Sequence, residues 1–427
     1  MTATSIIARP VTTSDELMFQ LQLADQAFSA EPSENGAQRW GQFITTSPEY
    51  RPEEIRGAFR ASEQAGGYII YERKLRMGAA QLTTGCISAV VTHPHYRHLG
   101  VARAMMQDAI NYAQTHKHAL LLLDGIPKFY YRFGYTDVFD LSIQDINRAA
   151  ILAQRSSTYS VRPATVDDAQ AILALYERQY SPYSGSFTRS LERQVHLLRY
   201  RTAQNPPFLA LDAAGQPQGY LILSHGEIHP QALEMAADNW SAAIALLQHH
   251  ARLVQGPGAP TMLRYRLPPT APVLQWMIDT LEVPDTTMWR HPADEWGILN
   301  QTFHHRYTGW MARLSDLPTL MQELLPEWQA RWRRALAHWS GDISLLIDDE
   351  TCALHIDGSE LQLQDRPAPS PSIVRLTAQA FMQLVFGYRS INQLVEQETQ
   401  PLAPDLRSAL DILFPTGHAW IPSSDMF

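Results

Sequence analysis

The chain has 427 residues, more than one hydrophobic core ordinarily holds, which indicates about two to four domains. With 45% hydrophobic and 18% charged residues, it has the composition of a soluble globular protein. The net charge of −9 argues against a nucleic-acid partner, because phosphate binding needs a basic face. No run approaches the ~20 continuous apolar residues that span a bilayer, and the first residues lack the features of a secretion signal. We therefore expect a cytoplasmic location without membrane insertion.

The residue types that hold metals are not arranged for that purpose. Cys86 and Cys352 lie far apart in the sequence, which argues against a disulfide framework or a Cys-rich zinc site. His93, His95 and His98 are close together, but no carboxylate accompanies them at the spacing of metal ligands. We predict no metal site, and expect these histidines to be solvated or to contact phosphate.

The first part of the chain predicts strands that alternate with helices. A polar, cap-like run at 12–16 precedes an apolar-periodic stretch through Phe28, which is typical of a helix start. The short apolar run 120–123 is typical of a buried strand. Further strands are expected at 67–71, 77–83 and 86–92, with a second helix at 100–115. Such alternation predicts an α/β layer.

A second block opens near Ser160. Residues 161–168 repeat the opening of the chain at 7–15, with Arg-Pro followed by Thr and Asp before a helix, which indicates an internal repeat. Helices are expected at 169–180 and 239–253, and a hairpin at 207–212 and 219–223.

A third block opens near Trp296. Its pattern predicts helices at 317–339, 377–386 and 404–413, a hairpin at 343–347 and 352–356, and a strand at 361–363. Four tryptophans are expected to pack the core of this block, with a lipid pocket as the alternative: Trp310, Trp328, Trp332 and Trp339.

The strongest chemical signal is the segment 90–106, in which a β-branched strand runs into a turn and the turn opens a helix. Backbone N–H groups at such a helix start, with the helix dipole behind them, form a site for a pyrophosphate. Gly100 lets the backbone approach the phosphate because it has no Cβ. Arg97 can add a charge-assisted contact or brace the loop.

This segment resembles the acetyl-CoA motif of the GNAT superfamily of N-acetyltransferases, in which [Q/R]-x-x-G-x-[G/A] follows a strand. In that family the strand splays open and pairs with the pantetheine arm of the cofactor. Thr92 departs from the Val that the family usually has. The resemblance implies that acetyl-CoA binds to nine residues: Val90, Val91, Thr92, Arg97, His98, Leu99, Gly100, Val101 and Ala102.

A second motif, Phe129–Tyr135, is similar to the F-Y-x-R-F-G-[F/Y] segment of the same family. There a tyrosine acts as general acid, and Tyr130 occupies its position. A phenol with a pKa near ~10 can protonate a departing thiolate while it stays neutral at pH 7. The other aromatic side chains of the motif are expected to pack.

Over its whole length the chain resembles the Eis-like (enhanced intracellular survival) acetyltransferases. The resemblance implies an α/β (α+β) fold with a catalytic GNAT domain at 1–155, a second, degenerate GNAT-like domain at 156–295 and a sterol-carrier-protein-like domain at 296–427. It also implies a homo-oligomer. The second block lacks R-x-x-G-x-G after Leu223, so we expect it to hold no cofactor.

In that family the terminal carboxylate of the chain serves as general base, which here is the carboxylate of Phe427. Asp425 and a water molecule are the alternatives. The predicted reaction is direct transfer of an acetyl group from acetyl-CoA to a primary amine, either a small molecule (an aminoglycoside or a polyamine) or a lysine side chain of a peptide. The alternative is a non-catalytic protein whose GNAT scaffold carries a lipid- or partner-binding C-terminal domain.

Overall fold

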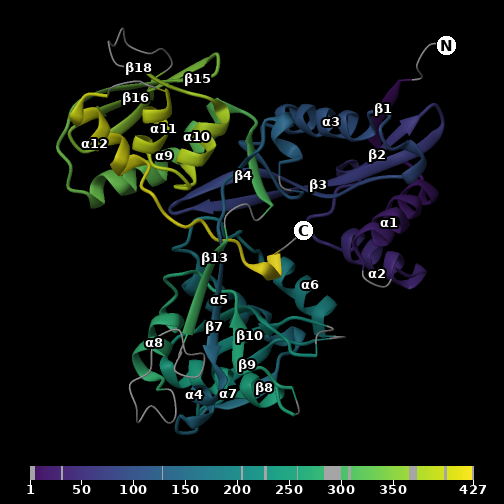
Figure 1. The fold of residues 1–427 in the computed structure, drawn as a ribbon, viewed down its shortest axis with the longest axis vertical. Coiled ribbons are helices and arrows are strands. Elements are labelled where there is room, and N and C mark those ends of the chain that lie inside the picture. The colour runs from purple at the N-terminus through teal and green to yellow at the C-terminus, as the bar shows by residue number, and fades with distance from the viewer. Residues whose placement is uncertain are drawn as a thin grey trace. The chain divides into compact units, whose positions relative to one another are not determined.

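The structure is a computed structural model of the chain. It describes residues 5–29, 32–126, 128–202, 205–225, 228–256, 258–282, 300–305, 309–364, 373–398 and 402–425. The chain folds into two compact units (Figure 1), the first built from 1–139 with 307–419 and the second from 140–306 with 420–426. No helix in the described part is both long and apolar enough to cross a membrane.

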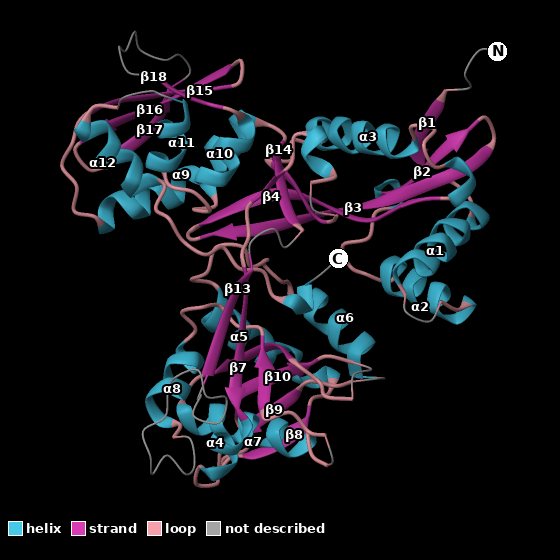
Figure 2. Ribbon diagram, in the orientation of Figure 1, coloured by secondary structure: helices cyan, strands magenta, loops and turns pink. Residues whose placement is uncertain are grey.

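A seven-stranded mixed sheet organises the first unit (Figure 2). Only the pair β4–β5 is parallel, and the other neighbours are antiparallel. The strands in spatial order are β1 (Ile6–Pro10), β2 (Ile55–Arg60), β3 (Glu63–Met77), β4 (Ala80–Thr92), β5 (Leu120–Asp124), β14 (Trp310–Leu314) and β6 (Thr136–Asp137).

Helices cover both faces of this sheet, because successive strand residues point to opposite sides. On one face, α1 (Ser14–Phe28) and α2 (Glu34–Thr45) pack on a core that includes Ile69 and Val91. On the other face, α3 (Val101–Thr115) packs on a core that includes Tyr68 and Ile70. Thr13 caps α1 by accepting a hydrogen bond from the Glu16 N–H, which confirms the predicted helix start.

One strand expectation is wrong. Residues 77–83 were expected to form one strand, but β3 ends at Met77 and β4 begins at Ala80. The tight turn between them places Gly78 at a φ of 58°, a conformation that suits glycine.

The C-terminal part of the first unit contains a four-stranded sheet with four helices. The strands in spatial order are β17 (Glu360–Gln364), β16 (Glu350–Asp357), β15 (Gly341–Ile347) and β18 (Ile373–Leu376). The helices are α9 (Leu317–Arg334), α10 (Ala378–Val385), α11 (Ile391–Glu398) and α12 (Pro404–Leu413). Trp328 and Trp332 are buried there, as expected. Trp310 is also buried, but it lies outside that part, in β14 of the first sheet, edge-on to Phe139.

Two glutamates of α9 bind the β3–β4 hairpin. Glu327 accepts a hydrogen bond from the Ala79 N–H at 2.7 Å, and Glu323 accepts one from the Thr83 N–H at 2.7 Å. Because Glu327 is buried, this contact attaches the C-terminal part of the unit to its first sheet.

A second seven-stranded mixed sheet organises the second unit. In spatial order its strands are β13 (Asn300–His305), β7 (Leu141–Asn147), β12 (Met262–Tyr265), β11 (Ala232–Ala237), β10 (Pro217–Leu223), β9 (Phe208–Leu211) and β8 (Ser160–Pro163). Its helices are α4 (Arg148–Ala153), α5 (Ala169–Tyr180), α6 (Leu191–Thr202), α7 (Trp240–Leu253) and α8 (Pro272–Thr280). Residues of α7 and α8 share one core cluster, and residues of α5 and α6 share another. The predicted hairpin β9–β10 is confirmed.

The two sheets open with the same local structure. In the first, the Arg9 guanidinium binds the Glu16 carboxylate at 2.6 Å and the Pro10 carbonyl at 2.8 Å. In the second, Arg162 binds the Asp168 carboxylate at 2.8 Å and the Pro163 carbonyl at 3.0 Å. This correspondence gives the sequence repeat a structural basis.

The predicted mixed α+β class is confirmed, with several mixed sheets. The sheets do not follow the boundaries expected after residues 155 and 295, because β7 joins the second sheet and β14 joins the first. Division into three domains stays a prediction.

Candidate active site

The parallel strands β4 and β5 separate part-way along the sheet. Their ladder runs from the pair Thr84–Leu120 to the pair Ile87–Leu123, while β4 continues to Thr92. Ala89 has a φ of 52°, and the register of β4 against β3 shifts beside it, as in a β-bulge. Beyond Ile87, the edge of β4 that faces β5 therefore has no ladder partner among the described residues.

The loop after β4 leads into an uncapped helix start. A short 3₁₀ turn (Pro94–Tyr96) is followed by His98 at a φ of 65° and Gly100 at a φ of 88°. Gly100 precedes α3 without any side-chain cap hydrogen bond, so the N–H groups of the first turn of α3 remain available to a ligand. A Cβ built on Gly100 would meet no atom within 4 Å, so this backbone faces open space.

The splayed strand and the loop together line a cavity of about 540 Å³. Eight of the nine residues expected to bind the cofactor line it, and Leu99, 48% exposed, does not. The other lining residues come from the end of α1, from the 3₁₀ turn after β4, from the first turn of α3 and from the segment after β5: Ala27, Phe28, Tyr96, Arg103, Ile126, Phe129, Arg132 and Phe133.

Two basic residues of this cavity were missed by the sequence analysis. Arg103 lies in the first turn of α3, and Arg132 lies in the aromatic motif. The Arg132 guanidinium lies 4.3 Å from the centre of the Phe129 ring and donates to the Phe129 carbonyl at 2.9 Å. Together with Arg97 and His98, these side chains surround the cavity with groups that suit a phosphorylated ligand. Arg132 is a letter of the aromatic motif and Arg103 directly follows the phosphate-loop motif, but only the fold shows that both line one cavity.

Tyr130 begins the 3₁₀ turn Tyr130–Phe133, and its ring is buried beside the cavity wall formed by Phe129. Gly125 makes room for it, because a Cβ there would come within 2.4 Å of the Tyr130 ring. Burial raises the pKa of Tyr130 to about 12, so its phenol is neutral at pH 7. Tyr130 is not among the residues that line the cavity.

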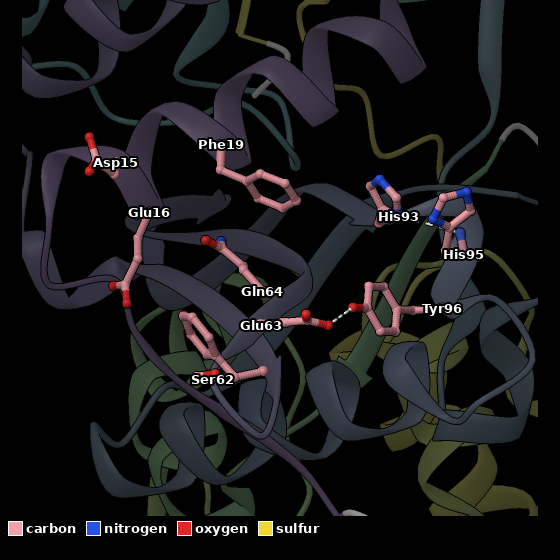
Figure 3. Close-up of a pocket in the computed structure, with 10 residues that line it drawn as sticks. Asp15, Glu16, Phe19, Ser62, Glu63, Gln64, His93, His95 and Tyr96 are labelled. Atoms are coloured by element: carbon pink, nitrogen blue, oxygen red, sulfur yellow. Dashed lines mark hydrogen bonds between the residues drawn. The ribbon is translucent and has the colours of Figure 1, made fainter.

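A second cavity, of about 470 Å³, also has Tyr96 in its wall (Figure 3). Its walls carry aromatic rings and carboxylates. Figure 3 shows Tyr96 donating a hydrogen bond to Glu63, and the His93 ring stacks on Phe19 with centroids 6.1 Å apart. The hydrogen bond from Arg9 lowers the pKa of Glu16 to about 2, so that pair is ionised.

The second unit has a corresponding pair of parallel strands, β11 and β12, with α7 following β11. The sequence analysis looked for the counterpart of the phosphate loop after Leu223, at the end of β10. That position is wrong, because β10 is followed by its antiparallel neighbour β11, and the counterpart position is the connection from β11 to α7. Only Asp238 and Asn239 connect β11 to α7, and the Asn239 side chain caps the helix by accepting from the Ala242 N–H at 2.9 Å. The N-terminus of α7 is therefore unsuited to binding phosphate, because Asn239 already occupies one of its free N–H groups and Asp238 places a negative charge beside it.

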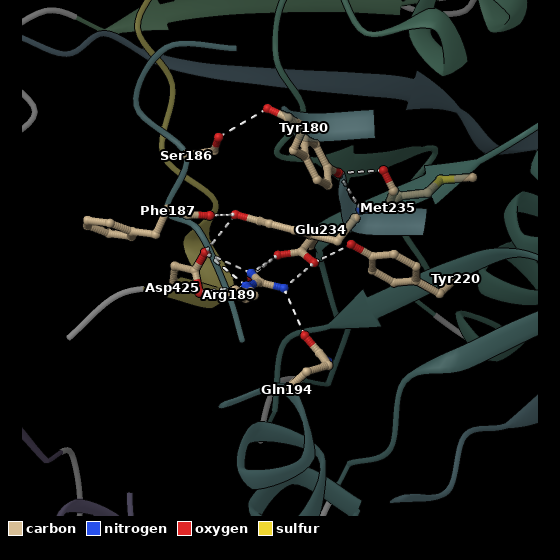
Figure 4. Close-up of polar contacts among 11 residues, drawn as sticks. Tyr180, Ser186, Phe187, Arg189, Gln194, Tyr220, Glu234, Met235 and Asp425 are labelled. Atoms are coloured by element: carbon tan, nitrogen blue, oxygen red, sulfur yellow. Dashed lines mark hydrogen bonds and ion pairs between the residues drawn. The ribbon is translucent and has the colours of Figure 1, made fainter. Parts of the chain in front are cut away.

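The sequence analysis named two carboxylates as candidates for the general base, those of Phe427 and Asp425. Phe427 lies outside the described residues. Asp425 is buried in the second unit and forms an ion pair with Arg189 at 2.8 Å (Figure 4). Among the described residues, no group of three or more His, Cys, Asp or Glu side chains is placed to hold a metal ion.

Comparisons with known proteins agree with this geometry. The family model of the acetyltransferase (GNAT) domain matches residues 8–138. No curated protein sequence is significantly similar to the chain.

Solved structures share the fold over the full length. A GCN5-related N-acetyltransferase from Anabaena variabilis has a TM-score of 0.73 at 15% identity, covering 99% of this chain and 100% of that one. Another, from Kribbella flavida, has a TM-score of 0.71 at 18% identity and covers 100% of both chains. Eis1 from Mycobacterium abscessus has a TM-score of 0.64 at 14% identity, covering 99% of this chain and 100% of that one.

The family match covers strands β2 to β6 and all the residues that line the cavity of about 540 Å³. Residues 8–138 form a GNAT acetyltransferase domain, which makes the chain an N-acetyltransferase that uses acetyl-CoA.

Proposed function

We propose that this enzyme transfers the acetyl group of acetyl-CoA to a primary amine by direct attack, with both substrates bound at once. An aminoglycoside, a polyamine and a lysine side chain are the candidate acceptors. The observation that carries the proposal is the separation of β4 from β5 at Ile87, directly before a basic cavity at an uncapped helix start. The thioester of acetyl-CoA supplies an acyl group that an amine can attack without a covalent enzyme intermediate.

The residues that would hold the cofactor fall into two groups. The free edge of β4 at 90–92 suits the amide groups of the pantetheine arm, and its N–H groups would stabilise the developing oxyanion. The loop 97–102 offers backbone N–H groups to the pyrophosphate, with Arg103 and Arg132 adding positive charge.

Proton transfer requires an acid and a base. Tyr130 would donate its phenolic proton to the departing thiolate, a role supported by its neutral state at pH 7 and its place beside Phe129 on the cavity wall. The carboxylate of Phe427, or a water molecule, would accept a proton from the amine. Asp425 is unsuited to that role, because its carboxylate is buried and bound to Arg189.

We further infer that the chain is Eis-like, with one active site, a degenerate second domain, and a sterol-carrier-like C-terminal domain that begins near residue 296. The four-stranded sheet with α9 to α12 and the capped start of α7 support this organisation. The proposal includes a homo-oligomer and a cytoplasmic location.

The test is an acceptor panel in which release of free thiol from acetyl-CoA is measured with an aminoglycoside, a polyamine and a lysine-containing peptide. Release that depends on one amine class identifies the acceptor. If acetyl-CoA raises the melting temperature but no amine triggers thiol release, the proposed acceptor chemistry is refuted while cofactor binding stands.

A further inference from the structure

The second cavity, of about 470 Å³, has no part in the proposed acetyl transfer (Figure 3). Its walls come from the start of α1, the turn between β2 and β3, and the 3₁₀ turn after β4, all within the first unit. The cofactor cavity instead contacts the end of α1, at Ala27 and Phe28. The two cavities therefore meet this helix at opposite ends.

The two cavities also differ in charge. The described residues that line the second cavity include three carboxylates, those of Asp15, Glu16 and Glu63, and no lysine or arginine. The described residues that line the cofactor cavity include three arginines and no carboxylate. The second cavity therefore repels a phosphate and attracts a cation.

A guanidinium of the chain itself shows which group fits these walls. The Arg9 guanidinium lies 3.7 Å from the centre of the Phe59 ring and binds the Glu16 carboxylate at 2.6 Å. An aromatic face and a carboxylate thus hold one cation together, which is the chemistry of cation–π recognition. Phe59 and Glu16 both line the cavity, so this arrangement forms part of its wall.

The remaining carboxylates of the cavity have no cation of their own. Glu63 accepts a hydrogen bond from the neutral Tyr96 hydroxyl (Figure 3), and Asp15 lies in the first turn of α1, where the helix dipole favours a carboxylate. Arg60 acts electrostatically on Tyr96 but does not line the cavity. Within the described part of the chain, neither Asp15 nor Glu63 forms an ion pair.

The wall also offers an unpaired hydrogen-bond acceptor. Gln64 donates from Nε2 to Gln20 Oε1 at 3.2 Å, whereas the buried Oε1 of Gln64 has no hydrogen-bond partner among the described residues. A buried amide oxygen without a donor is costly, and an N–H group of a cationic ligand is the kind of donor that it lacks.

We propose that this cavity binds an organic cation, an alkyl group that ends in a guanidinium or an ammonium. The carboxylates of Asp15 and Glu63 balance its charge, and its alkyl part packs on the rings of Phe19 and Tyr96. A free small molecule and a peptide side chain both offer this chemistry. The inference goes beyond the proposed function, because it assigns a ligand to a site that the acetyl transfer does not use.

The probe is n-butylguanidinium, which has no primary amine to acetylate. Its binding can therefore be measured whether or not the proposed acceptor chemistry holds. Ligand-observed NMR on the full chain at low salt should show one saturable site, with a Kd of about 1 mM for so small a ligand. The neutral analogue n-butylurea should bind at least about tenfold more weakly, because it lacks the charge.

Two double variants test the place of binding. Asp15→Asn with Glu63→Gln should raise the Kd by about tenfold, because two of the three carboxylates are removed. Asp349→Asn with Glu350→Gln makes the same change of charge at the exposed turn between β15 and β16, and should leave the Kd unchanged. All four carboxylates are exposed, so both double variants should keep the melting temperature of the parent.

Binding that is weakened in the cavity variant and kept in the control supports the proposal. It is overturned if n-butylguanidinium does not saturate a site, if n-butylurea binds equally well, or if the two double variants behave alike. Displacement by acetyl-CoA also overturns it, because the cavity would then belong to the cofactor.

A capped peptide with a single arginine distinguishes the two sources of the cation. A lower Kd than that of n-butylguanidinium assigns the cavity to a peptide side chain, and a higher Kd assigns it to a free small molecule.

Discussion

Ile87 pairs with Leu123 in the last step of the parallel ladder between β4 and β5, and two residues later Ala89 bends β4 away. The residues that follow, 90–92, line the cavity with the loop and helix start at 97–103. The fold thus places a free strand edge next to a set of unused helix N–H groups. That combination suits a ligand with an amide-bearing arm and a pyrophosphate, which is the chemistry of acetyl-CoA.

The variant Gly100→Ala should weaken acetyl-CoA binding. A φ of 88° costs a residue with a Cβ about 1 kcal/mol. The added methyl group meets no protein atom within 4 Å, so it would stand in the cavity where the phosphate must approach. We expect the KM for acetyl-CoA to rise by about tenfold, in steady-state assays with saturating amine.

Gly215→Ala is the control for backbone strain. Gly215 has a φ of 77° in the turn between β9 and β10, and a Cβ there also meets nothing within 4 Å. Both variants should lose similar thermal stability, but only Gly100→Ala should raise the KM. If the KM for acetyl-CoA is unchanged in Gly100→Ala, the proposal that this loop binds the pyrophosphate is refuted.

The variant Tyr130→Phe should lower kcat while leaving the KM for acetyl-CoA near its normal value. A general acid contributes about 10²–10⁴-fold to the rate. Burial holds the pKa of Tyr130 at about 12, so the phenol is protonated throughout neutral and mildly alkaline pH. The loss should therefore be constant between about pH 7 and pH 10.

Tyr135→Phe tests whether any lost hydroxyl in this region has the same effect. The Tyr135 ring is buried 6.0 Å from that of Tyr130, and its hydroxyl has no hydrogen-bond partner among the described residues. Its removal should leave kcat unchanged. If the two variants behave alike, packing rather than proton donation explains Tyr130.

Local patterns predicted the elements whose signals are contained within one segment. The bounds of α5 at 169–180 and α12 at 404–413 follow from periodicity and turn residues, and both match the structure. The phosphate loop was predicted for the same reason, because strand, turn and helix start are consecutive.

Contacts between distant segments were not predictable in this way. β14 enters the first sheet between β5 and β6, pairing 310–314 with 120–124, and its short sequence does not specify that partner. Likewise, the sequence offered Asp425 as a base, but only the fold shows it bound to Arg189. Burial and pairing of a carboxylate depend on residues far away in the chain.

The variant Glu327→Ala should destabilise the first unit. Glu327 is buried, accepts from the Ala79 N–H at 2.7 Å and binds Arg331 at 2.7 Å. Its loss removes the acceptor of the Ala79 N–H and the carboxylate partner of the largely buried Arg331 guanidinium, which should lower the free energy of unfolding in urea by about 3 kcal/mol. Glu360→Ala, which breaks an exposed pair with Arg333, should cost less than about 1 kcal/mol. Equal losses would show that the α9 contact contributes no more than a surface pair.

The variant Glu54→Gln should change how stability depends on pH. Burial raises the pKa of Glu54 from 4.5 to about 7, so the folded state holds this proton more tightly than the unfolded chain does. The stability from the shift is present below about pH 4.5 and is lost as pH rises through 7. Glutamine cannot ionise, so the variant should match the parent near pH 5 and exceed it at pH 8, by as much as about 3 kcal/mol. Parallel stability curves for Glu54→Gln and the parent would refute the raised pKa of Glu54.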